Sequence, residues 1–347
     1  MSPFILDGIA WGSKNIYFNV SVAFLSALIL GFISRSYGTS MTTFGPVRQF
    51  GYVKKRAECM TDHDCVKGCP YEYLLQIYGE HHFQPFITFF APELQREDPE
   101  KYLLILDIMD AVHFCLILVD DISDDSPQRK SQPTAHLLYG ASETANRAYF
   151  VLTQVINRAL RDRPVLGVEL MNALEKILHG QDMSLVWRRD GLKSFPVDHN
   201  ERIAAYREMA RLKTGALFVL LGRLVNDGRK DLDDLLTRFG WFAQLQNDCK
   251  DIYSAEYAAN KGAIAEDLRN GELTFPVVLA LNSEGTATTV RKAIESHKEE
   301  DIQAGVRALR LSHIRAECLK SLQEAGQGLE QLVSLWGRRE TMQSAGT

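Results

Sequence analysis

Apolar residues recur at three- and four-residue spacing from about Pro70 to about Trp336, and no strand pattern interrupts them. That spacing gives an α-helix one apolar face, which each segment can bury against its neighbours. The sequence therefore predicts an all-α bundle around a central cavity for residues 70–336. Residues 1–69 are predicted to form an N-terminal extension, and residues 337–347 a polar tail. The expected helical segments are 101–121, 141–160, 166–188, 203–225 and 232–257.

Charge and cysteine content exclude several classes of protein. The formal net charge of -5 gives no general attraction to nucleic acid, so an anionic ligand would need local bases or bound cations. The six cysteines are scattered in a chain too long to need disulfide staples, which favours a reducing compartment. The run Cys59, His63, Cys65 and Cys69 matches no standard zinc spacing and is interpreted as part of a polar connector.

An apolar helix runs directly into four carboxylates, Asp120, Asp121, Asp124 and Asp125. On a helix Asp120 and Asp124 lie one turn apart, and Asp121 lies within about 100° of arc of them. These three carboxylates would repel one another without a cation, and oxygen ligands suit Mg²⁺. The alternative is a solvated acidic helix end, which the helix dipole disfavours.

A second acidic cluster repeats this geometry, because Asn247, Asp248 and Asp251 occupy positions i, i+1 and i+4 at the end of another apolar helix. Two such clusters can face each other across a bundle cavity. Polar and basic residues follow or separate them, and each has an alternative interpretation as a solvated surface group. They are Arg129, Lys130, Lys213, Thr214, Asn260 and Lys261.

From about Pro70 to Leu281 the chain resembles the trans-prenyl diphosphate synthases, particularly the fungal geranylgeranyl diphosphate synthases. The matching marks are Asp120-Asp121-Ile122-Ser123-Asp124, Pro133-Thr134-Ala135-His136, Gly180-Gln181, Lys213-Thr214-Gly215, Gln244, Asn247-Asp248, Asn260-Lys261-Gly262, Glu266-Asp267 and Phe275-Pro276. The resemblance implies an isoprenoid synthase-type helical fold, a homodimer, and three Mg²⁺ ions between the acidic motifs and an allylic diphosphate.

The resemblance also implies a role for each residue that matches a family motif. Asp120, Asp121, Asp124 and Asp248 would be catalytic. The metal ligands would be Asp120, Asp124, Asn247, Asp248 and Asp251. The donor diphosphate would be held by Arg129, Lys130, Lys213, Thr214, Gln244, Asn260 and Lys261.

The chain departs from the family where the acceptor binds. Members bind isopentenyl diphosphate through Gly-Lys-x-x-Arg, and the aligned stretch here is Gly79-Glu80-His81-His82-Phe83. A diphosphate acceptor loses two cations and gains a repelling carboxylate at Glu80. Isopentenyl diphosphate is therefore expected to be a poor acceptor.

Residues 78–83 and 107–113, together with the Asn-Asp-x-x-Asp motif, look like the fungal indole diterpene geranylgeranyl transferases (3-geranylgeranylindole synthases). These enzymes join geranylgeranyl diphosphate to indole-3-glycerol phosphate, giving 3-geranylgeranylindole. The resemblance implies acceptor contacts from His81, His82, Phe83 and His113, since aromatic and imidazole rings suit an indole. Each histidine could equally be a satisfied structural residue.

Two other functions stay open. One is a geranylgeranyl diphosphate synthase that elongates with isopentenyl diphosphate, which Glu80 and Phe83 disfavour. The other is a non-catalytic regulatory partner subunit, which would not need intact Asp120, Lys213 or Lys261.

The N-terminal extension contains an apolar run at residues 16–33, at the lower end of bilayer-spanning length. It is either a membrane-anchoring helix or a hydrophobic segment docked on the protein. Lys54, Lys55 and Arg56 follow it, a bias that indicates a cytosolic catalytic domain. The protein is thus expected inside the cell, and membrane-associated if the run is an anchor.

Overall fold

The computed structural model describes residues 68–344, with side chains to residue 337. They belong to a compact unit that spans residues 59–347. The apolar run 16–33 and the residues Cys59, His63 and Cys65 lie outside the described part, so the anchor and the connector remain predictions.

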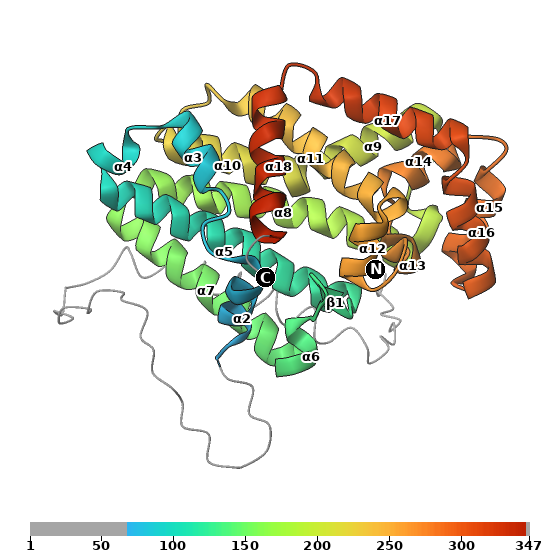
Figure 1. Cartoon of the computed structure of the whole chain (residues 1–347), viewed down its shortest axis with the longest axis horizontal. Helices are drawn as coiled ribbons and strands as arrows, with labels where there is room; N and C mark the ends of the chain where they lie inside the picture. Colours follow the sequence, from blue (N-terminus) through green and yellow to red (C-terminus); the bar gives the residue numbers. More distant parts are fainter. Residues whose placement is uncertain (1–67, 345–347) are drawn as a thin grey trace, which may run out of the picture. The chain divides into compact units, whose positions relative to one another are not determined.

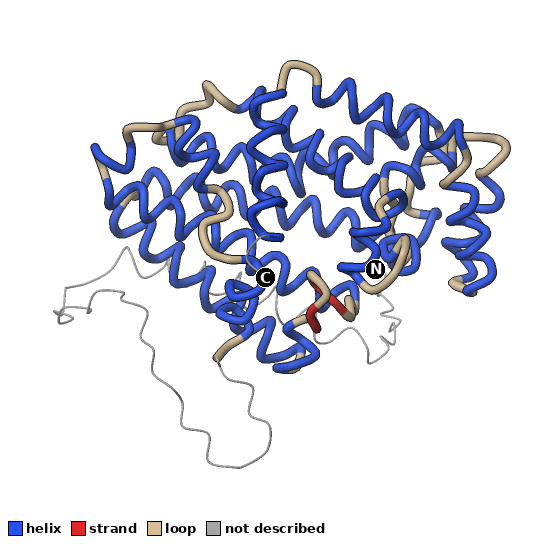
Figure 2. The backbone as a smooth tube through the Cα atoms, in the orientation of Figure 1, coloured by secondary structure: helices blue, strands red, loops and turns tan. Residues whose placement is uncertain are grey.

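Helices make up nearly all of the described chain, which confirms the predicted all-α class (Figures 1 and 2). The α-helices are α2 (Pro70–Tyr78), α3 (Gln84–Phe90), α4 (Leu94–Glu97), α5 (Pro99–Asp124), α6 (Ala135–Tyr139), α7 (Ala141–Asp162), α8 (Pro164–Asp190), α9 (His199–Ala210), α10 (Ala216–Val225), α11 (Asp233–Tyr253), α12 (Ala255–Lys261), α13 (Glu266–Arg269), α14 (Phe275–Leu281), α15 (Ala287–Ser296), α16 (Glu299–Leu309), α17 (Ser312–Gly326) and α18 (Glu330–Ser344). A 3₁₀ turn, η1, spans Gly191–Lys193, and a π-helical turn, η2, spans Arg211–Gly215.

Helix α5 forms the centre of the apolar core. Asp98 caps its first turn by accepting a hydrogen bond from the Lys101 N–H (3.1 Å), and Pro99 occupies a first-turn position that needs no donor. Among the described residues α5 is the one helix long and apolar enough to cross a membrane, but 67% of its most apolar stretch is buried inside the protein. We interpret it as a core helix whose end delivers Asp120 and Asp124.

A small hairpin corrects the expectation that no strand interrupts the helices. Strand β1 (Gln128–Arg129) pairs antiparallel with β2 (Gln132–Pro133), as the short red segment in Figure 2 shows. Lys130 and Ser131 link the strands with φ of 52° and 60°, the left-handed conformations that a two-residue hairpin turn of type I′ requires. Two-residue strands are too short to produce an alternating pattern in the sequence.

Two expected boundaries also change. Helix α18 continues to Ser344, so the backbone is helical over most of the segment predicted to be a polar tail. The expected helix 203–225 is divided into α9, η2 and α10, because the backbone widens to a π-turn at Arg211–Gly215. Such turns are frequent at functional sites.

The π-turn packs directly on α8 at Gly180. A Cβ atom at this position would lie 2.4 Å from the Lys213 backbone nitrogen, closer than real contacts allow. We expect Gly180→Ala to lower the free energy of unfolding by about 2–3 kcal/mol, since the overpacking outweighs the better helix propensity of alanine. Urea unfolding measures the change. Gly285→Ala is the matched control, because nothing lies within 4 Å of a Cβ there, and an equal loss in both variants would contradict the explanation.

Candidate active site

Residues far apart in the sequence meet near the C-terminal end of α5. The hairpin contacts α12, and the two elements lie beside the end of α5 in Figure 1. Lys213, from the π-turn, faces carboxylates from three segments, Asp120 and Asp124 of α5, Asp267 of α13 and Glu272 beyond it. The first acidic motif and the predicted bases therefore share one charged site.

Asp120 is held by groups from two other elements. Its Oδ1 accepts a hydrogen bond from Gln181 Nε2 of α8 (3.1 Å) and lies 3.6 Å from Lys213 Nζ. Burial alone would raise the pKa of Asp120, but Lys213, Arg129 and Lys261 together lower it. Asp120 thus stays an anion, as a metal ligand must, and the cations around it are of the charge that binds a diphosphate.

Asp124 is paired with Arg188, a residue that sequence reasoning missed. Arg188 Nη1 donates to Asp124 Oδ1 (2.6 Å), and Arg188 Nη2 donates to the Ser123 carbonyl (2.5 Å). Glu272 lies 3.8 Å from the same guanidinium. Burial and the neighbouring Asp120 raise the pKa of Asp124 to about 6. Arg188 therefore fixes the orientation of a carboxylate that is costly to ionise.

Asp121 is the carboxylate that holds Arg129. Its Oδ1 accepts from Arg129, which the hairpin folds back onto α5, and burial raises the pKa of Asp121 although Arg129 opposes this. The charge of Asp120 also contributes to the raised pKa of Asp121, so these two carboxylates still act on each other. In this structure Arg129 contacts a carboxylate where the sequence predicted a diphosphate contact.

Asp248, in the second motif, is fully hydrogen-bonded. It accepts from the Tyr206 hydroxyl, from Gln244 Nε2 (2.8 Å) and from the Phe275 N–H (2.7 Å). Burial raises its pKa to about 6, against the effect of these donors. The Thr214 hydroxyl donates to Gln244, so two predicted diphosphate residues here support Asp248. Tyr206 was missed by sequence reasoning because a single tyrosine in a helix carries no motif.

Asp251 and Asn247 complete this motif. Asp251 Oδ1 accepts from the Glu266 N–H (3.2 Å), whereas its buried Oδ2 has no hydrogen-bond partner in the structure. Burial and the nearby Asp267 raise the pKa of Asp251 to about 8, although Lys261 lowers it. Asn247 Oδ1 accepts from the Tyr257 hydroxyl (3.0 Å). Asp251 therefore presents an unused buried oxygen atom.

The other predicted donor-side groups line the same region. Lys261 Nζ lies 3.0 Å from Asp267 Oδ1 and 3.2 Å from Glu266 Oε2. Asn260 binds the hairpin turn, since its carbonyl accepts from the Ser131 N–H (2.9 Å) and its Oδ1 from the Ser131 hydroxyl (3.0 Å). Lys130 Nζ lies 4.3 Å from the centre of the Tyr78 ring. The hairpin thereby connects α12 to the last residue of α2.

The predicted acceptor residues fall into two groups. Phe83 and His82 are buried, with Phe83 packed on Phe218 (ring centres 6.1 Å apart) and His82 on Tyr78 (5.5 Å). His113 is partly exposed and packs on Phe83 (5.5 Å). His81, also partly exposed, contacts Asp110 of α5. In this structure Phe83 is thus a packing residue between His113 and Phe218, and its contact with an acceptor stays a prediction.

Within residues 68–344 no three histidine, cysteine, aspartate or glutamate side chains converge closely enough to hold a metal ion. The candidate ligands Asp120, Asp124 and Asp251 are instead paired with cations or left with an unused oxygen. All are hard oxygen donors, which fits Mg²⁺, and a Mg²⁺ site usually borrows further oxygens from a bound phosphate.

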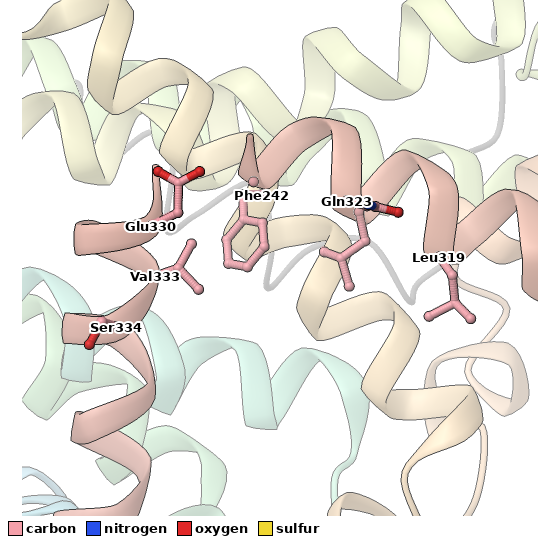
Figure 3. A pocket seen from close by; sticks show the side chains of 8 residues that line it. Phe242, Leu319, Gln323, Glu330, Val333 and Ser334 are labelled. Carbon is pink, nitrogen blue, oxygen red and sulfur yellow. The ribbon is translucent and has the colours of Figure 1, made fainter. Parts of the chain in front are cut away.

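A separate pocket of about 570 Å³ lies between α11, α17 and α18 (Figure 3). It is mainly apolar, with Phe242, Leu319 and Val333 among its lining residues, and Glu330 is its one acidic group. None of the predicted site residues lines it, and it lacks the paired charges that bind a diphosphate. We therefore place the candidate active site at the charged cluster and not in this pocket.

The raised pKa of Asp251 predicts how the metal-free protein responds to pH. Its folded-state pKa of about 8 lies above the unfolded value near 3.9, so its contribution to stability is greatest below pH ~4 and is lost as the pH rises toward 8. In the presence of a chelator, the Asp251→Asn variant should not lose stability in this way as the pH rises. At pH 8.5 its free energy of unfolding should be higher than that of the wild type by at least ~1 kcal/mol.

Chemical denaturation at pH 5, 7 and 8.5 measures this difference. Asp234→Asn, at an exposed position of the same helix, is the control and should keep the wild-type pH profile. A wild-type profile in Asp251→Asn as well would show that this carboxylate is not destabilised by burial.

Comparison with known proteins places the site in a family context. Residues 68–310 match the polyprenyl synthetase family. The chain is 63% identical over 316 residues to Prenyltransferase terC of Tolypocladium album, covering 91% of this chain and 93% of that protein. It is 63% identical over 283 residues to Prenyltransferase idtC of Claviceps paspali, covering 81% and 77%.

A solved structure supports the same fold. The polyprenyl synthase of Caulobacter crescentus, complexed with calcium and isoprenyl diphosphate, has a TM-score of 0.62 and 22% identity, over 74% of this chain and 79% of that one. The predicted isoprenoid synthase-type bundle is thereby confirmed.

Proposed function

We propose, starting from the fact that this chain belongs to the polyprenyl synthetase family, that it transfers the geranylgeranyl group of geranylgeranyl diphosphate to C3 of indole-3-glycerol phosphate. The family and the relatives named prenyltransferases make it an enzyme of prenyl transfer. The donor, the acceptor, the metal and the homodimer are the parts that we propose.

The observation that carries the proposal is the contrast between the two halves of the site. On the donor side, Lys213, Lys261 and Arg129 surround the acidic motifs. On the acceptor side, the loop at 79–83 offers no lysine or arginine, Glu80 is exposed, and Phe83 is buried against Phe218. A second diphosphate would find neither of the two cations of the family's Gly-Lys-x-x-Arg segment in this loop, whereas the partly exposed imidazoles of His81 and His113 suit an indole and a single phosphate.

Mg²⁺ is the metal that these residues fit. Asp120 and Asp124 would hold it from α5, and Asp251 would hold it with its unpartnered Oδ2. When bound, it would neutralise the charge that develops on the departing diphosphate. The relative whose structure contains calcium and isoprenyl diphosphate supports the use of a divalent cation.

The protein's own groups then divide the work. Lys213 and Lys261 attract the diphosphate and stabilise the negative charge it gains as the C–O bond breaks. Gln181 and Arg188 orient Asp120 and Asp124. Departure of the diphosphate leaves an allylic cation, which the electron-rich C3 of the indole attacks. Loss of glyceraldehyde 3-phosphate then restores the aromatic ring.

Acceptor competition tests the proposal. With geranylgeranyl diphosphate, the wild type should use indole-3-glycerol phosphate at least ~100-fold better, in kcat/KM, than isopentenyl diphosphate, because a missing charge pair in a desolvated site costs a few kcal/mol. Product analysis by mass spectrometry measures both reactions. Efficient elongation with no prenylated indole would instead identify a chain-length synthase.

Glu80→Lys refines this test. Glu80 is exposed, so the change should not disturb the fold, and it should raise the use of isopentenyl diphosphate relative to the indole acceptor. Glu93→Lys, an exposed glutamate after α3, is the control and should leave the ratio unchanged.

A further inference from the structure

His81 and Asp110 form a pair that the reaction as described so far does not use. The backbone N–H of His81 donates to Asp110 Oδ2 (2.8 Å), and His81 Nδ1 lies 3.1 Å from the same oxygen. Asp110 is a buried carboxylate in the middle of α5, with 5% of its surface exposed. One carboxylate thus fixes both the backbone and the ring of one histidine.

The local backbone shows that this arrangement is imposed. His81 has φ of 62°, a left-handed conformation that side chains other than glycine seldom adopt. Burial raises the pKa of Asp110 to about 6, although its hydrogen bonds to His81 oppose this. A strained residue and a buried carboxylate each carry a cost, and both persist where the surrounding contacts over-determine them, which occurs mainly at functional sites.

The pairing leaves one ring nitrogen available. If Nδ1 carries the proton and donates it to Asp110, Nε2 presents a lone pair, the orientation of a histidine that serves as a general base. About a third of the His81 side chain is exposed (34%), and Glu80 Oε2 lies 3.9 Å from Nε2.

His81 also lies in the wall where the acceptor is proposed to bind. The preceding residues Tyr78 and Gly79 lead into this loop, and the Tyr78 ring lies under Lys130 of the hairpin. The next residue, His82, packs on His113 of α5 (5.8 Å). The loop therefore connects the donor-side hairpin to the His81–Asp110 pair.

We infer that His81 is the base of the cleavage step, with Asp110 as its positioning residue; this rests on the proposed indole acceptor. Attack by indole C3 forms the bond to the prenyl carbon. C3 then bears both the prenyl group and the glycerol phosphate side chain, and the indole ring carries a positive charge. His81 Nε2 then takes the proton of the hydroxyl on the side-chain carbon attached to C3. The O–H electrons form the aldehyde C=O, the bond from that carbon to C3 breaks, and its electron pair returns to the ring. No oxidant or reductant is needed.

Single-turnover kinetics separates the two stages. In the wild type, diphosphate and glyceraldehyde 3-phosphate should form at the same rate. His81→Gly removes the imidazole and suits the left-handed backbone, so it should fold normally. In this variant glyceraldehyde 3-phosphate should form ~10²-fold more slowly and lag at least tenfold behind diphosphate. Added imidazole should restore its rate. His199→Asn, at an exposed histidine of α9, is the control.

Asp110→Asn provides a second, independent variant. In this variant glyceraldehyde 3-phosphate should again lag behind diphosphate, and it should form about tenfold more slowly than in the wild type. The double variant should be no slower than His81→Gly alone, because the two residues act as a unit. Equal slowing of both products, no slowing, or no rescue by imidazole would overturn the role of His81. Absence of any prenylated indole from the wild type would instead refute the proposed acceptor.

Discussion

Asp120→Asn is expected to lower kcat/KM by at least ~10³-fold while the protein stays folded. The variant keeps the shape of the side chain and its contact with Gln181 but loses the anion that faces Lys213 and the proposed metal. Loss of one preorganised charge at a site of this kind lowers the rate ~10²–10³-fold, and the rate falls further if a metal ion is lost with it. Steady-state assays at saturating Mg²⁺ measure the change.

Stability identifies the reason for this loss. Removing the Asp120 charge relieves its repulsion of Asp124, but it also removes the attraction of Lys213, Arg129 and Lys261, which lowers the pKa of Asp120 on balance. The anion therefore stabilises the folded protein at neutral pH, and the metal-free variant should unfold at a modestly lower temperature than the wild type while staying folded at the assay temperature. Asp125→Asn is the control, because Asp125 is exposed and asparagine tolerates its left-handed φ of 50°. The kcat/KM of Asp125→Asn should differ from that of the wild type by less than threefold. An equal loss of activity in Asp120→Asn and Asp125→Asn would mean that the acidic cluster serves folding.

Lys213→Met should reduce kcat/KM by ~10²–10³-fold and should destabilise the metal-free protein more than Asp120→Asn does, because it removes the counter-charge of several carboxylates. Lys213 is the common neighbour of Asp120, Asp124 and Glu272, and these carboxylates raise its pKa against the effect of burial. Without the ammonium group they lose their shared counter-charge. Lys176→Met, at an exposed position of α8, is the control and should change neither property.

The double variant Asp120→Asn with Lys213→Met gives the sharper test. Each change removes one member of a contacting pair, so the stability effects should not add, and the double variant should recover much of the stability that Lys213→Met loses. Activity should not recover. Recovery of both would mean that the pair only holds the fold together.

Much of this site could be predicted because its chemistry is carried by short motifs. Asp120 and Asp124 are four positions apart in the sequence, and the period of an α-helix places them on the same side, about one turn apart. Lys213 and Lys261 could be assigned from motifs as well, and the structure brings both to the same charged region. The spacing of apolar residues also predicted where helices form, for example α5, α7 and α8.

The rest depends on contacts between distant segments. Arg188 meets Asp124 across 64 positions, and Tyr206 meets Asp248 across 42, and neither pair has a local signature. The contact between Asp121 and Arg129 could not be predicted, because the hairpin that returns Arg129 to α5 is too short to recognise. The packing of Phe83 against Phe218 could not be predicted either, because spacing says nothing about packing partners.

The π-turn at Arg211–Gly215 has a consequence for helical phase. A π-turn adds one residue to a helix, which rotates everything beyond it by about 100° relative to an uninterrupted α-helix. Helix α9 directs Tyr206 toward Asp248, while α10 places Phe218 in the apolar core against Phe83. The extra residue thus allows the continuous helix formed by α9, η2 and α10 to direct side chains to two different sides of the bundle. Deleting a single residue there would rotate either the Tyr206 side or the Phe218 side away from its partners.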